Sequence, residues 1–139
     1  MEREYFKNLE HLTSETPLEL SAVVDRLAFN EQGLIPIITQ DATTREVLMF
    51  AWMNKEALYE TLSKNYMTYW SRSRKKLWVK GETSGHFQAL VSMSFDCDGD
   101  VVLCLVNQRG AACHTGRPNC FYLPVNTENH QVTVQSTTV

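Results

Sequence analysis

Several features that would assign this 139-residue chain to a common class are missing from it. No C-x-x-C pair occurs, which argues against a zinc ribbon. No apolar run approaches membrane-spanning length, and the charged residues 1–6 lack the apolar centre of a signal peptide. The net charge of −3 gives no broad basic surface for nucleic acid. We therefore expect a cytoplasmic protein with no membrane and no nucleic-acid partner.

The chain is long enough to bury one core, so we expect a single domain over residues 1–139. Within it we expect an N-terminal arm over residues 1–30, a core over residues 31–122 and a tail over residues 123–139. In a reducing compartment its four cysteines are better interpreted as metal ligands or reactive thiols than as disulfides.

Potential metal ligands concentrate in residues 96–120. They are three carboxylates, three of the four cysteines and one histidine: Asp96, Asp98, Asp100, Cys97, Cys113, Cys120 and His114. In an extended chain the three carboxylates would share one face and Cys97 would lie on the other. Oxygen ligands suit magnesium or calcium and thiolates suit zinc. The spacing thus indicates one or two metal sites, and three thiolates on zinc would leave a fourth position for water.

The same stretch has simpler interpretations. Asp98 and Gly99 separate two apolar runs, and a D-G pair there is typical of a hairpin turn without any metal. An EF-hand is disfavoured, because Val101 and Asn107 occupy the positions that need glycine and glutamate. Cys104 has hydrophobic neighbours on both sides and is interpreted as a small core residue.

Two further loops carry groups that could bind a ligand. Residues 71–76 combine two arginines, Arg72 and Arg74, with two lysines and two hydroxyls, a set that suits phosphate oxygens. Residues 80–86 place Lys80 and two glycines around three polar side chains, Glu82, Thr83 and Ser84. Glycine permits backbone conformations that bring amides close to a ligand. Either loop could also be an ordinary solvated turn.

Strands outnumber helices in the hydrophobic pattern. Strands are predicted at residues 34–38, 47–52, 67–70 and 77–79, with a hairpin over residues 91–106. Residues 47–52 are predicted to be buried on both faces, and Pro36 to keep its strand at an edge or a bulge. One clear helix is predicted at residues 55–62, weaker ones at residues 2–12 and 17–27, and an edge strand or frayed end at residues 126–139. We expect a mainly β (α+β) fold with a mixed, mostly antiparallel sheet or pseudo-barrel.

Taken together, residues 33–121 resemble the phosphoribosyl-AMP cyclohydrolase family. The resemblance rests on segments in family order: Gly33-Leu-Ile-Pro36, Glu46-Val-Leu-Met49, Met53-Asn54, Glu56-Ala-Leu58, Trp70-Ser-Arg-Ser73, Leu77-Trp78, Lys80-Gly-Glu-Thr-Ser-Gly85, Asp96-Cys-Asp-Gly-Asp100, Ala112-Cys-His-Thr-Gly116 and Cys120-Phe121. The Pro118-Asn119 pair departs from the commoner small or basic residues, which leaves the loop shape in doubt.

The resemblance implies hydrolytic opening of the adenine ring of phosphoribosyl-AMP, at the N1–C6 bond, in histidine biosynthesis. It implies a zinc- and magnesium-dependent homodimer, with Zn²⁺ on Cys97, Cys113 and Cys120 and Mg²⁺ on Asp96, Asp98 and Asp100. Cys97 would be supplied across the dimer interface. Some relatives carry a fused pyrophosphohydrolase domain, for which residues 121–139 are too few, so we expect the monofunctional form.

Within this chemistry we assign His114 to proton transfer and Arg72, Arg74 and Lys80 to the two phosphates of the substrate. Glu82, Thr83 and Ser84 are predicted to contact substrate as well. A rival hypothesis is a zinc-stabilised module that binds a nucleotide or RNA without catalysis. A zinc deaminase is disfavoured, because His114 is followed by Thr115 and Gly116 and the H-x-E and P-C-x-x-C motifs are missing.

Overall fold

A computed structural model describes residues 2–137 of the chain. Within these residues the helical segments are α1 (Glu2–Asn8), η1 (Leu9–His11), α2 (Leu20–Val24) and α3 (Lys55–Lys64). The strands are β1 (Ile35–Asp41), β2 (Val47–Met53), β3 (Thr68–Ser71), β4 (Lys76–Val79), β5 (Gln88–Phe95), β6 (Val102–Gln108), β7 (Val125–Asn126) and β8 (Gln131–Val132). The fold is mainly sheet with few helices, as predicted. No helix among residues 2–137 is long and apolar enough to cross a membrane.

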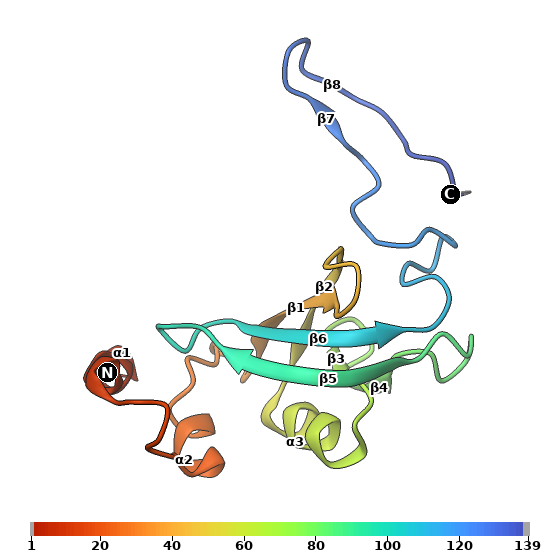
Figure 1. Ribbon diagram of the computed structural model, residues 1–139. Coiled ribbons are helices and arrows are strands. Elements are labelled where there is room, and N and C mark those ends of the chain that lie inside the picture. The colour runs from red at the N-terminus through yellow and green to blue at the C-terminus, as the bar shows by residue number, and fades with distance from the viewer. Residues whose placement is uncertain (1, 138–139) are drawn as a thin grey trace.

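The central sheet has the strand order β2-β1-β6-β5 (Figure 1). Strand β1 runs parallel to β6, whereas β1–β2 and β5–β6 are antiparallel, so the predicted mixed sheet is confirmed. The pseudo-barrel is wrong: across residues 2–137 no pairing joins the edge strands β2 and β5. The second hairpin, β3–β4, forms a separate two-stranded sheet whose β3 packs against β2.

Two strand predictions require correction. Strand β1 is central rather than an edge, and it accommodates Pro36 because its pairing with β6 begins only at Ile37. The missing N–H of Pro36 therefore falls outside that ladder. Strand β2 is an edge strand and is not buried on both faces, since Val47 is 42% and Phe50 is 50% exposed. An apolar run alone does not reveal which of its faces is covered.

Helix α3 forms where the sequence predicts it. The Asn54 side chain accepts a hydrogen bond from the backbone N–H of Ala57 at 2.8 Å, which caps the helix start. The helix ends at Asn65 in the left-handed conformation, with φ of 62°. Its buried face, which includes Ala57 and Leu58, packs toward β2 and β3.

A chain of buried polar side chains crosses the core, and the sequence analysis did not predict it. The Tyr69 hydroxyl donates to Gln88 Oε1 at 2.7 Å and lies 2.8 Å from Thr39 Oγ1. Gln88 Nε2 in turn donates to Gln108 Oε1 at 2.8 Å. Thr39, Tyr69 and Gln88 are fully buried. Burial raises the pKa of Tyr69, which is therefore a neutral donor. This chain ties β1, β3, β5 and β6 together.

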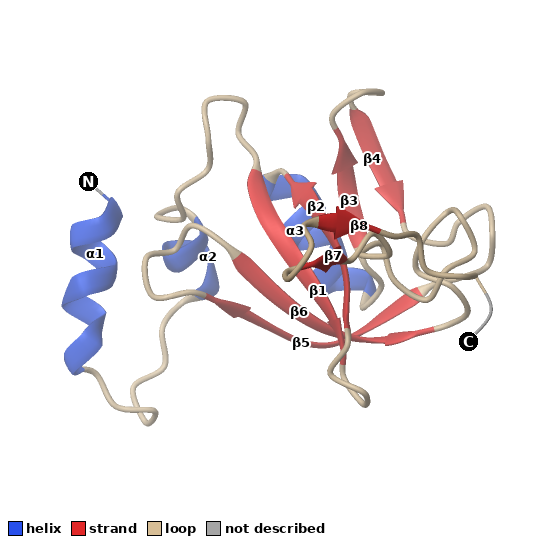
Figure 2. Ribbon diagram, turned by 90° about the horizontal axis from the view of Figure 1, so that it is seen from above, coloured by secondary structure: helices blue, strands red, loops and turns tan. Residues whose placement is uncertain are grey.

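The N-terminal helices lie at one end of the central sheet, and the C-terminal segment leaves from the other end (Figures 1 and 2). The first predicted N-terminal helix corresponds to α1 and η1. The second, predicted over residues 17–27, is shorter than expected and comprises only the five residues of α2. Phe6 of α1 is buried in the core. The tail prediction is corrected: β7 and β8 pair with each other, and within residues 2–137 with no other strand. Residues 138–139 of the predicted tail lie outside the described residues.

Candidate active site

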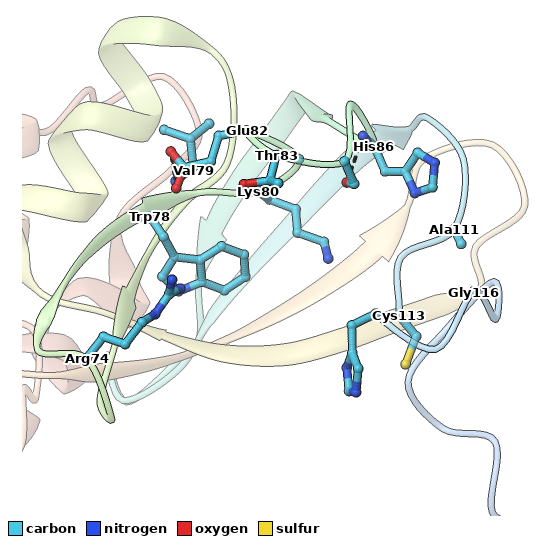
Figure 3. A pocket seen from close by; sticks show the side chains of 13 residues that line it. Arg74, Trp78, Val79, Lys80, Glu82, Thr83, His86, Ala111, Cys113 and Gly116 are labelled. Atoms are coloured by element: carbon cyan, nitrogen blue, oxygen red, sulfur yellow. Dashed lines mark hydrogen bonds between the residues drawn. The ribbon is translucent and has the colours of Figure 1, made fainter.

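A cavity of about 340 Å³ opens between the loop after β4 and the loop after β6 (Figure 3). Most of the predicted site residues line it: Arg74, Lys80, Glu82, Thr83, Ser84, Cys113 and His114. The fold brings them together because β4 ends where residues 80–86 begin, and β6 delivers residues 110–117 to the same edge. In Figure 3 the Lys80 side chain extends into the cavity toward the segment that carries Cys113.

Cys113 and Cys120 form a pair of neighbouring thiols in the loop after β6. Cys120 is held by its backbone N–H, which donates to the Leu48 carbonyl at 2.8 Å. Burial alone would raise the pKa of Cys113, but hydrogen bonds from Thr115 and Cys120 and the charge of Lys80 lower it below its ordinary value. Burial and the proximity of Cys113 raise the pKa of Cys120 to about 11. The two thiols therefore lie close enough to interact, and as thiolates they could both bind one cation.

Lys80 connects the two loops around the cavity. Its Nζ donates to the Ala112 carbonyl at 2.5 Å and lies 5.7 Å from the centre of the Trp78 ring. Burial lowers the pKa of Lys80, although the nearby Cys120 and Cys113 partly oppose that change. A half-buried ammonium beside a cavity can bind an anionic oxygen strongly, because water competes less for it.

Cys97 and the three carboxylates lie at the opposite end of the β5–β6 hairpin. The seven residues of β6 separate the Cys97 turn from the loop that holds Cys113. At a rise of about 3.3 Å per residue, this amounts to roughly 20 Å. Cys97 is exposed, next to the N-terminal helices rather than the cavity. The three thiols therefore do not meet within one chain.

The segment with the three carboxylates is a turn, so the predicted alternation of an extended chain is wrong there. Gly99 has φ of +67° and its N–H donates to the Asp96 carbonyl at 3.1 Å. Asp96 Oδ1 accepts from the backbone N–H groups of Asp100 at 2.8 Å and Val101 at 3.2 Å. The cause is the D-G pair, which favours a tight turn over a strand.

The carboxylates of this turn are already engaged with neighbours. Burial would raise the pKa of Asp96, but hydrogen bonds from Asp100 and from backbone N–H groups lower it. The pKa of Asp100 is raised, chiefly by its hydrogen bond to Asp96. Asp98 forms an ion pair with Arg3 at 3.7 Å.

Neither proposed metal site is complete within one chain. Among residues 2–137 no three His, Cys, Asp or Glu side chains lie close enough together to hold a metal ion. Zinc prefers thiolate ligands, so the Cys113–Cys120 pair is suited to it, but the third protein ligand of the proposed site is missing. The carboxylates of the turn are of the kind that magnesium prefers, but their hydrogen bonds hold them in a turn rather than around a cation.

Arg72 is separated from the other predicted phosphate ligands. Its guanidinium lies 4.9 Å from the centre of the Trp52 ring, in a shallow groove next to Trp70. Trp78 and His86 line the cavity as well, although no site role was predicted for either from the sequence. His86 follows directly on the glycine-framed loop, so its position in the sequence was a usable signal. The sequence does not show on which side of its strand the Trp78 side chain lies.

The phosphoribosyl-AMP cyclohydrolase family model matches residues 49–122, more than half of the chain. The chain belongs to the phosphoribosyl-AMP cyclohydrolase family. A phosphoribosyl-AMP cyclohydrolase of Roseobacter denitrificans is 58% identical over 107 residues, covering 77% of this chain and 84% of the relative. One of Archaeoglobus fulgidus is 59% identical over 96 residues, covering 69% and 89%. A Pseudomonas fluorescens relative, phosphoribosyl-AMP cyclohydrolase 2, is 60% identical over 103 residues, covering 74% and 70%.

The region matched by the cyclohydrolase model contains every predicted site residue. It begins at Met49 in β2 and ends at Tyr122, two residues after Cys120. The N-terminal helices, strand β1 and the β7–β8 hairpin lie outside it.

Proposed function

We propose that this chain opens the adenine ring of phosphoribosyl-AMP by hydrolysis, a step of histidine biosynthesis, in the cytoplasm. The supporting observation is the cavity, which cationic and hydroxyl side chains from residues 74–84 line together with Cys113, whose thiol lies next to that of Cys120. In this reaction a water oxygen bonds to C6, the N1–C6 bond breaks and N1 takes up a proton. C6 and its exocyclic nitrogen become a carboxamide, giving the formimino-aminoimidazole carboxamide ribonucleotide.

Lys80 and Arg74 bind the phosphates of the substrate in this proposal. Both line the cavity, and Lys80 is fixed by its 2.5 Å hydrogen bond to the Ala112 carbonyl. The hydroxyls of Thr83 and Ser84 donate to further phosphate oxygens, and the Glu82 carboxylate accepts from a ribose hydroxyl. Arg72 contributes from the adjoining tryptophan groove.

This assignment predicts that replacing Arg74 raises KM, whereas replacing the nearby Lys76 does not. Arg74→Ala is expected to raise KM about tenfold, because one charge-assisted hydrogen bond to phosphate is lost. Lys76→Ala is the matched control, since Lys76 is exposed and does not line the cavity. Steady-state kinetics on both variants measure the effect. Equal KM values in the Arg74→Ala variant and the parent would remove Arg74 from the phosphate site.

We propose that zinc is held by Cys113 and Cys120 of one subunit and Cys97 of its partner in a homodimer. The roughly 20 Å spanned by β6 keeps Cys97 from reaching the other two thiols in its own chain. Bound zinc would supply the Lewis acid that makes water nucleophilic at neutral pH. His114, exposed on the cavity wall beside Cys113, is placed to deliver the proton that N1 takes up. Magnesium on Asp96, Asp98 and Asp100 remains part of the proposal, with no reaction step assigned to it.

The activity is tested by the ultraviolet absorbance of phosphoribosyl-AMP mixed with zinc-loaded protein, with and without magnesium and with a chelator control. We expect a spectral change that needs protein and zinc, and a product heavier by one water. Unchanged substrate in the presence of folded, zinc-loaded protein would contradict the proposed function.

The shared zinc site is tested by mixing two inactive variants, Cys97→Ser and Cys113→Ser, under conditions of subunit exchange. Half of the dimers would then be mixed, and each mixed dimer regains one of its two sites. About a quarter of the parental activity should therefore return, given two-fold symmetry. A mixture that stays inactive despite exchange would show that the three thiols do not form a shared site.

A further inference from the structure

The chain continues after Cys120 into an extended segment, residues 121–134, here called the C-terminal arm. Figure 1 shows it standing away from the central sheet, with β7 and β8 near its tip. The arm is fixed at its base: the N–H of Cys120 donates to the Leu48 carbonyl at 2.8 Å, and the Arg117 guanidinium lies 4.0 Å from the centre of the Tyr122 ring. Its direction is therefore defined where it leaves the body.

The two strands of the arm have a definite register. Val125 is paired with Val132. The ladder continues toward the base, because Thr133 N–H donates to the Pro124 carbonyl at 3.1 Å and Gln135 N–H to the Tyr122 carbonyl at 2.9 Å. This register sets Leu123 opposite Val134.

One face of this ribbon is apolar and uncovered. Side chains at alternate positions of a strand share a face, so the paired positions 123, 125, 132 and 134 lie together, with residue 121 continuing the row. The exposed fractions are 53–63% for all five: Phe121, Leu123, Val125, Val132 and Val134. The intervening positions are mostly polar. A two-stranded hairpin is marginal in water on its own, and a continuous exposed apolar face marks a surface that packs against something.

An apolar groove of matching character lies at the other end of the molecule. Its volume is about 500 Å³, and its lining is mostly apolar: Phe6, Leu9, Leu18, Leu20, Val23 and Phe95. It extends to Asp96 and Cys97 of the β5–β6 turn. The N-terminal helices, which line the groove, and the base of the arm lie at opposite ends of β6 (Figures 1 and 2). The outermost apolar pair of the arm, Val125 and Val132, lies only about 13 Å from Phe121, which is shorter than the roughly 20 Å of β6, so the apolar face does not return along β6 to the groove of the same chain.

We propose that the C-terminal arm packs its apolar face into this groove on a second copy of the chain. This inference rests on the proposed shared zinc site, which sets the partner's Cys97 beside Cys120, the residue that precedes the arm. Because Cys97 also borders the groove, the arm would start at the mouth of the partner's groove. Two-fold symmetry repeats the contact, so each subunit gives one arm and receives another. The tip of the arm lies beyond residues 49–122, the region that the family model matches.

The contact is tested by photo-cross-linking in the zinc-loaded protein, with a benzophenone amino acid placed at Val125. Subunits labelled with heavy and light nitrogen are mixed and allowed to exchange, so that mass spectrometry separates links between chains from links within one. We expect links between heavy and light chains, from residue 125 to peptides that contain residues 6–23 or 95–97. The same amino acid at Gln131, on the polar face, is the control and should give few such links.

A second measurement uses the double variant Val125→Asp with Val132→Asp. Its dimer dissociation constant, from sedimentation equilibrium, should rise about 100-fold or more, since two buried apolar side chains become charged. Gln131→Asp with Thr133→Asp, which adds the same charges on the polar face, should leave the constant within a few-fold of the parent.

The outcomes separate this inference from the proposed function. Links within one chain or to other surfaces, in a dimer that binds zinc normally, would overturn the arm contact and leave the shared zinc site standing. An unchanged dissociation constant in the Val125→Asp, Val132→Asp variant would also overturn the arm contact. A monomeric, active, zinc-loaded protein would overturn the arm contact and the shared zinc site, while the proposed ring-opening activity would stand.

Discussion

The β5–β6 hairpin carries predicted metal ligands at both of its ends, but the two ends are held in different ways. At the cavity end, Gln88 of β5 and Gln108 of β6 belong to the buried polar chain that includes Tyr69. At the turn end, Asp96 accepts hydrogen bonds from backbone N–H groups, and the Phe6 ring lies against Gly99. The cavity end is braced by the core of its own subunit, whereas Cys97 at the turn end projects into solvent.

This difference bears on the proposed zinc ligands, which occur within 25 residues of sequence but do not come together in one chain. The cavity end supplies two thiols in a loop fixed by Lys80 and the Leu48 carbonyl. The turn end supplies one thiol on an exposed tip, as the proposed shared zinc site requires. Changes at the two ends should therefore differ in whether they affect stability, metal binding or both.

The largest effect is expected from the thiols, and it should be equal at the two ends. Cys97→Ser and Cys113→Ser should each lose zinc and lower kcat by about 10³-fold or more, because a Lewis acid contributes several kcal/mol to such a reaction. Metal analysis and turnover measure the two effects. Cys104→Ala is the control, since Cys104 is buried in the core, and it should retain zinc. Full zinc content in Cys97→Ser would mean that the turn end is not part of this site.

The polar chain should make the cavity end sensitive to substitution. Gln88→Ala is expected to lower the free energy of unfolding by about 3 kcal/mol, because Gln108 loses a buried partner, Tyr69 loses an acceptor and a cavity remains. Chemical denaturation measures the change. Gln32→Ala, in an exposed turn, should stay within about 0.5 kcal/mol of the parent. A loss below 1 kcal/mol for Gln88→Ala would show that the polar chain does not brace this end.

Asp98→Asn tests whether the turn end has a metal role separate from zinc. It should lower magnesium-dependent activity about tenfold while zinc content stays intact, since one anionic oxygen ligand is lost. Glu128→Gln, on the exposed arm tip, controls for the change in net charge. Loss of zinc in Asp98→Asn would mean that the carboxylates and the thiol of this turn do not act separately.

The last prediction concerns the packing of the turn end and its effect on stability alone. Gly99→Ala adds a Cβ in the left-handed region, where it would clash with the ring of the buried Phe6. We expect a loss of about 2 kcal/mol in unfolding free energy, from backbone strain and displacement of α1. Gly33→Ala is the matched control: its φ is +75° but nothing lies within 4 Å, so only the backbone cost of about 1 kcal/mol remains. Equal losses in both variants would show that Phe6 does not press on this turn.

Local features were predictable where neighbouring residues cause them. The Asn54 cap, helix α3 and the hairpin around Asp98 and Gly99 each depend on contacts within a few positions. The polar residues around Lys80 also proved to share one cavity, as their clustering in the sequence suggested. Burial was less predictable, because β2 has an apolar run but is an edge strand, and β1 is central despite Pro36.

By itself the sequence determined the kinds of side chain available for chemistry and the short elements that carry them, because these follow from composition and from spacing along a few residues. Only the tertiary structure decided which of those side chains meet. Strand β6 is rigid and extended, so it separates Cys97 from Cys113 by its full length, while pairing with β1 and β5 places Gln88 in the core. Separation in space depends on the path of the backbone between two residues, and that path is set by contacts with distant strands.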